Sequence, residues 1–257
     1  MPRRFLWLAS SALPLKAAET KDSLSLDEMA EYFDSIVFLS EIPGVQPSRV
    51  VKKWTQPLRV AIRSFEEDFV ERDGREVLRL KQVRVKKPHL KFIKKHLNSL
   101  IRATKLKIED SKKTGEPPNF MINFVPRRQM GNPYLAKANP KLLKRLAAEG
   151  GCYFLVWADG TTGKITNAII VVNAERLLIR INHCLLEEMT QALGLPNDSN
   201  KIAKSIFSDR SRRTELARTD QIILRTLYHP RMKAGLTREE AMAVAPEIIR
   251  ELDAALP

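Results

Sequence analysis

One helix of this sequence carries acidic and amide side chains at spacings that could support catalysis or metal binding. Residues 175–193 predict a helix whose apolar positions fall on one face. Glu188 falls in the middle of that face, where a lone ionised carboxylate would cost several kcal/mol. Glu188 must therefore be paired, hydrogen-bonded, neutralised or directed into an internal cavity. Its role is either that of a general base or metal ligand, or that of a buried structural carboxylate. The rest of the face comprises Leu177, Ile181, Cys184, Leu185 and Ala192.

The rest of the pattern predicts the elements that would position this helix. Strands are expected around residues 58–62, 119–126, 152–159 and 167–173, the last two as an antiparallel hairpin. Helices are expected from Ser25 onward and over residues 88–103, 140–149, 219–228 and 237–256. The segment 77–85 fits a strand or the front of a longer helix. This order predicts an α+β fold, in which the long helix packs against a mixed twisted sheet and a helical subdomain follows.

The chain is expected to hold one domain over residues 21–257, rich in strands to about residue 173 and helical over 174–257. Residues 1–20 have basic Arg3 and Arg4, then an apolar stretch and small residues, which is the plan of a secretory signal peptide. The alternative is an ordinary N-terminal tail. The first interpretation implies a periplasmic or secreted protein with no membrane span after removal of the signal, and the second a cytoplasmic one.

The two cysteines, Cys152 and Cys184, bear on the same question. In an oxidising compartment they could close a loop of about 30 residues, which would stabilise the fold by roughly 3 kcal/mol. In the cytosol they would be small buried apolar residues.

The charge of the chain is unusual, with a formal net charge of +14. Residues 49–113 hold 20 basic and 8 acidic residues, so the excess lies mainly in one middle segment. This segment could bind nucleic acid or another polyanion through residues 79–113, or it could be the solvated face of a helix. His89 and His96 lie on the same helix and are expected at the surface. The candidate polyanion-binding residues are Lys86, Lys87, Lys94 and Lys95.

The segment EEMTQALGLPND, residues 187–198, is similar in layout to the zinc helix of metzincin-type metallopeptidases, HExxHxxGxxH or HExxHxxGxxD. This resemblance places Glu188 at the catalytic glutamate and Gly194 at the glycine that turns the chain. The strand hairpin before the helix and the segment TDQIILRTLYHPRM, residues 219–232, add to it. The three ligand positions of the pattern fall on Glu187, Gln191 and Asn197.

The chain resembles more closely a proteobacterial family named domain of unknown function 2927. The shared residues are KW..P.RV at 53–60, the cysteine and glutamates of HCLLEEMTQALGLPND at 183–198, and the D...LR.LY.PR..G.T..EA run at 220–241. Together they cover most of residues 33–245. The resemblance implies an exported protein, because many members of that family look exported or lipid-anchored.

The sequence differs from the peptidase pattern at the metal-binding positions, and these differences determine which function we expect. Both zinc-binding histidines are replaced, and amide oxygens are poor zinc ligands compared with imidazole. Glu187 with Asp198 or His183 could still hold a harder ion such as calcium, magnesium or manganese. We therefore expect an exported zincin-like domain without a cofactor, which binds a peptide or a cell-envelope polymer. The alternatives are a metal-dependent peptidase with Glu188 as general base and a divalent metal ion, and a polyanion-binding protein.

Overall fold

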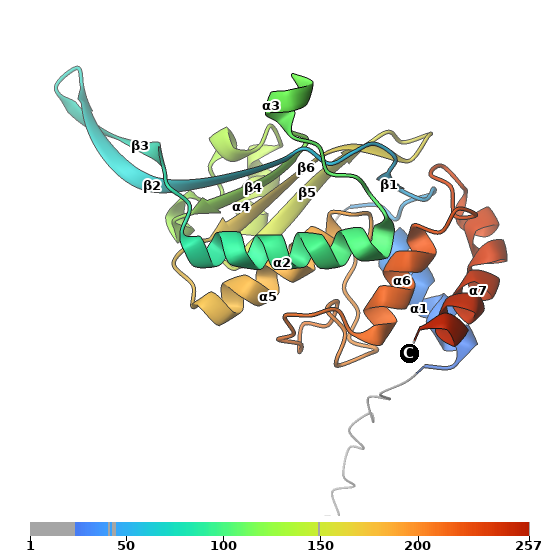
Figure 1. Cartoon of the computed structure of the whole chain (residues 1–257). Helices are drawn as coiled ribbons and strands as arrows, with labels where there is room; N and C mark the ends of the chain where they lie inside the picture. The colour runs from blue at the N-terminus through green and yellow to red at the C-terminus, as the bar shows by residue number, and fades with distance from the viewer. Residues whose placement is uncertain (1–23, 41, 43–44, 149, 257) are drawn as a thin grey trace, which may run out of the picture.

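The structure is a computed structural model that describes residues 24–40, 42, 45–148 and 150–256. The α+β fold predicted from the sequence is confirmed, with a mixed sheet between helices and a group of helices at one end (Figure 1). The signal-peptide prediction falls on residues 1–20, which lie outside the described residues. Among the described helices, none is long and apolar enough to cross a membrane.

The sheet has six strands in the described part of the chain. Parallel pairs join β2 to β4, β4 to β6 and β1 to β6, whereas β3 and β5 run antiparallel to their neighbours β2 and β6. The predicted hairpin of β5 and β6 is present, and the ambiguous segment 77–85 is mostly strand. The strands are β1 (Lys53–Trp54), β2 (Val60–Arg72), β3 (Arg75–Val83), β4 (Phe120–Val125), β5 (Cys152–Ala158) and β6 (Lys164–Asn173).

The strand β2 is much longer than its apolar alternation predicted. It pairs with β4 only over residues 60–64, while its pairing with β3 continues out to Arg72. The far part of this hairpin therefore extends beyond the sheet as a two-stranded ribbon, which projects from the body of the molecule (Figure 1). Phe69 and Leu78 are cross-strand partners on this ribbon, and both are exposed.

The helices begin and end largely at the positions that the capping residues and prolines of the sequence predict. Ser25 and Glu28 form a reciprocal capping box, and Pro88 and Pro140 stand at helix starts, where a missing N–H donor does no harm. The helices are α1 (Leu26–Phe38), α2 (Lys87–Thr104), α3 (Ser111–Thr114), α4 (Pro140–Ala148), α5 (Leu178–Gln191), α6 (Arg218–Leu227) and α7 (Arg238–Ala255), with short 3-10 turns η1 (Arg127–Gln129) and η2 (Pro133–Leu135).

Apolar side chains cover both faces of the sheet. On one face, Phe124 and Ile170 belong to a large core that extends to α2, α5 and the helices α1, α6 and α7. On the other face, Tyr153 and Val171 pack with Leu143 of α4 in a smaller core. Because α1 packs on α7, the helical group at one end of the molecule combines the first and the last helix.

Two local predictions are wrong. Leu177 was expected on the buried face of its helix, but it stands before the first turn of α5 and is 74% exposed. His89 and His96 were expected at the surface, yet both are buried in α2. The His89 ring stacks on Phe124 with centroids 4.2 Å apart, and Nε2 of His96 lies 2.8 Å from Oδ1 of Asn182 on α5. The two histidines therefore mark the side of α2 that packs on the sheet and on α5.

Candidate functional site

The predicted inward direction of Glu188 agrees with the structure. The side chain is only 5% exposed, and it comes from α5, which packs against β5 and β6. Glu188 also lines a cavity of about 630 Å³, which we call the α5–β5 cavity. Its walls come from the end of α4, the start of β5, α5 and the segment 198–212. Glu188 is therefore buried against the sheet and also lines a cavity that is large enough for a ligand.

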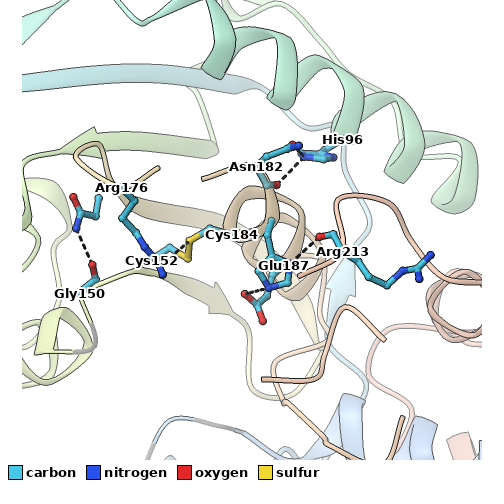
Figure 2. Close-up of a disulfide and its surroundings, with 10 residues drawn as sticks. His96, Gly150, Cys152, Arg176, Asn182, Cys184, Glu187 and Arg213 are labelled. Carbon is cyan, nitrogen blue, oxygen red and sulfur yellow. Dashed lines mark hydrogen bonds and ion pairs between the residues drawn. A yellow bond between two sulfur atoms is a disulfide. The ribbon is translucent and has the colours of Figure 1, made fainter. Parts of the chain in front are cut away.

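A disulfide joins Cys152 at the start of β5 to Cys184 on α5 (Figure 2). The two Cα atoms are 6.2 Å apart, and Nη1 of Arg176 lies 3.9 Å from Sγ of Cys184. One carboxylate oxygen of Glu188 and the two sulfur atoms all lie within 4.8 Å of one another. Metal ions bind cysteine as the thiolate, so the disulfide removes both sulfur ligands from this cluster.

His183 and Glu187 form a second polar pair, one turn apart on α5. Nδ1 of His183 donates to the carbonyl oxygen of Arg213 at 2.7 Å, which assigns the tautomer because a carbonyl can only accept. Burial lowers the pKa of His183 below its ordinary value, so the ring is neutral near pH 7. Its Nε2 lies 3.6 Å from Oε2 of Glu187. Among the described residues, no third His, Cys, Asp or Glu completes a metal-binding cluster with this pair.

The remaining ligand positions of the peptidase pattern diverge. Nε2 of Gln191 donates to Oδ1 of Asp198 at 2.8 Å, within the lining of the α5–β5 cavity. Asn197 points elsewhere, because its amide nitrogen donates to Oγ of Ser35 on α1 at 3.3 Å. Glu187, Gln191 and Asn197 therefore do not converge on one point, and these residues do not fit the zinc ion that the resemblance implies.

Arginines surround the α5–β5 cavity, and sequence reasoning missed them as a group. They come from α4, from the segment before α5, from α5 itself and from the segment after Asp209, so no spacing along the chain links them. The cavity lining combines Arg145, Arg176, Arg180 and Arg212 with the acidic Glu187, Glu188, Asp198 and Asp209. A ligand in this space would meet charges of both signs.

The basic segment is arranged as a solvated helix face. Lys86, Lys87, Lys94 and Lys95 are all exposed on or beside α2, while Ile93 and Leu100 are buried beneath it. Lys95 binds Glu215 at 2.9 Å.

The fold and the site together define an α+β domain with a mixed-charge cavity between an edge strand and a buried helix. The chain belongs to the family described as Protein of unknown function (DUF2927), whose model matches residues 26–247. No curated protein and no solved structure matches the chain significantly.

Proposed function

We propose that this protein binds an extended peptide or a cell-envelope polymer in the α5–β5 cavity and does not hydrolyse it. The observation that carries the proposal is the position of the cavity at the start of an edge strand. β5 pairs with β6 in the described sheet, and its first residues, Cys152 and Tyr153, line the cavity. An extended chain can add to such an edge through main-chain hydrogen bonds while its side chains enter the adjoining space.

The charges of the cavity support a ligand that carries acidic groups and amide or amine groups. Arg180 and Arg176 can hold carboxylates through paired N–H donors, and Glu187 and Asp198 can accept hydrogen bonds from N–H groups. Peptides and the peptide-bearing polymers of the cell envelope offer both kinds of group.

The divergence of Glu187, Gln191 and Asn197 supports binding without catalysis, in a zincin-like domain whose metal site is degenerate. The second candidate function is that of a metal-dependent peptidase, favoured by the Glu188 carboxylate in the cavity lining. In that case Glu188 would be the general base. A third candidate, polyanion binding through residues 79–113, rests on the exposed lysines of α2 and predicts an affinity that falls steeply with salt.

The disulfide between Cys152 and Cys184 supports export of the protein to the periplasm or the cell exterior. Disulfides persist in oxidising compartments and are rare in the cytosol. A signal peptide in residues 1–20 would supply the route.

The binding proposal predicts that Arg180→Gln weakens ligand binding by roughly tenfold, because one charge-assisted contact is lost. The probes are a peptide digest of casein and purified peptidoglycan, with binding to the full chain measured by co-sedimentation and by fluorescence anisotropy. Arg210→Gln is the matched control, because Arg210 is exposed and does not line the cavity.

Two other results would contradict this proposal. If neither probe binds at physiological salt, the cavity does not take peptide or envelope polymer. If the purified protein carries stoichiometric metal and hydrolyses the casein peptides, and Glu188→Gln abolishes hydrolysis, the peptidase candidate replaces it.

A further inference from the structure

A second cavity lies between α2 and α6, and its chemistry differs from that of the α5–β5 cavity. This α2–α6 cavity has a volume of about 340 Å³ and is also lined by the segment 214–216 and by Leu186 of α5. Its polar lining comprises Lys95, His96, Ser99, Arg102, Thr214, Glu215, Gln221 and Arg225. The space is large enough for a small organic molecule.

Positive charge predominates in this cavity. The described lining holds three cationic side chains and one carboxylate, that of Glu215. Glu215 is held by Lys95 in an ion pair of 2.9 Å. This pair leaves the charges of Arg102 and Arg225 unbalanced within the lining. Burial lowers the pKa of His96, although the hydrogen bonds with Asn182 oppose the shift, so this ring adds no further positive charge near pH 7.

The guanidinium of Arg225 has a donor that needs a partner. Its Nε is buried, and no described residue accepts a hydrogen bond from it. A buried N–H of a charged group is costly when it is left unsatisfied, so native proteins pair nearly all such groups. An anion in the cavity would balance the positive charge and would accept from the guanidinium of Arg225, which lines the cavity. The hydroxyls of Ser99 and Thr214 and the amide of Gln221 offer further donors.

We propose that the α2–α6 cavity binds a small oxyanion, as a phosphate or carboxylate group of a small molecule. Arg225 and Arg102 hold the anion, and Lys95 joins them once it releases Glu215. This site shares no lining residue with the α5–β5 cavity. It shares Lys95 with the exposed lysine face, whereas Lys94, the neighbour of Lys95, does not line it.

The test titrates the full chain with inorganic phosphate and, separately, with citrate by isothermal titration calorimetry at constant ionic strength. We expect saturable binding of at least one of them at one site per chain, and the preferred one distinguishes phosphate from carboxylate chemistry. Lys95→Gln and Arg102→Gln should each weaken binding by roughly tenfold. Glu215→Gln should strengthen it several-fold, because it frees Lys95 and removes the opposing charge.

Lys94→Gln is the matched control, since it removes the same charge one residue away and outside the cavity. An equal effect of Lys94→Gln and Lys95→Gln would overturn the proposal, because it would mean non-specific attraction to a basic surface. Absence of saturable binding of both anions would overturn it as well. Arg102 and Lys95 are exposed, so their variants keep the fold, and circular dichroism verifies this directly.

Discussion

Replacing Asp220 with alanine is expected to lower the free energy of unfolding by roughly 4 kcal/mol, because several buried donors lose a charged acceptor at once. Asp220 of α6 is fully buried. Its Oδ2 accepts from the backbone nitrogens of Ala217 at 2.7 Å and Ile206 at 3.1 Å, and its Oδ1 accepts from Oγ of Ser205 at 2.6 Å. Ser205 in turn accepts from the hydroxyl of Tyr32 on α1 at 2.9 Å. Asp220 thus links α6, the segment before it and α1.

Urea denaturation followed by circular dichroism measures this loss. Asp253→Ala is the control, because Asp253 binds Arg218 at the surface and exposed ion pairs contribute about 1 kcal/mol or less. A loss for Asp220→Ala no larger than for Asp253→Ala would contradict the structural role of the buried carboxylate.

The same carboxylate makes stability depend on pH in a defined direction. Burial raises the pKa of Asp220 to about 6, although hydrogen bonds from Ser205, Ala217 and Ile206 oppose the shift. The folded state therefore binds more protons than the unfolded state between about pH 4 and pH 6. The stability contributed by this group falls as the pH rises through that window. Asp220→Asn should remove this part of the pH dependence, and equal slopes for the two proteins would contradict it.

Gly194→Ala is expected to destabilise the protein by roughly 4 kcal/mol, because the new side chain meets both backbone strain and a steric clash. Gly194 has φ +110°, a conformation that other residues rarely adopt, and an added Cβ would lie 2.1 Å from the carbonyl oxygen of Lys52. The backbone before β1 packs directly on this glycine, so the contact cannot be relieved by a change of rotamer.

Two control variants separate the causes of this loss. Gly115→Ala has a similar positive φ with nothing within 4 Å, so it should cost only about 1 kcal/mol. Gly160→Ala has open space and no positive φ, so it should cost little. Thermal unfolding measures all three. If Gly194→Ala cost no more than Gly115→Ala, the close approach of Lys52 would be irrelevant to stability.

The result for Gly194 bears on how the peptidase-like segment is interpreted. In the metal-binding pattern the glycine turns the chain toward a third ligand. Here the turn brings Asn197 to Ser35 of α1, and the missing side chain makes room for Lys52. Packing alone therefore accounts for glycine at this position.

The sequence was sufficient for features that depend on local periodicity. The 3.6-residue period placed Glu188 inward, and alternation with a turn-rich connection placed β5 beside β6. The sequence was not sufficient for features that depend on contacts between segments far apart along the chain. The buried position of His96 depends on Asn182 of α5, which is 86 residues away. The arginines of the α5–β5 cavity come from separate elements, and no pattern along the chain brings them together.

The two ends of β2 are expected to differ in local stability, because one end lies in the sheet and the other in the β2–β3 hairpin that extends beyond it. Residues 60–64 of β2 pair with β4, and Ser64 pairs with β3 as well, whereas the outer residues have β3 as their hydrogen-bonded partner in the described sheet. A two-stranded ribbon without a covering layer is marginally stable in water. Its outer amides should therefore open locally, at a lower free energy than the amides of β4, while the core of the sheet stays folded.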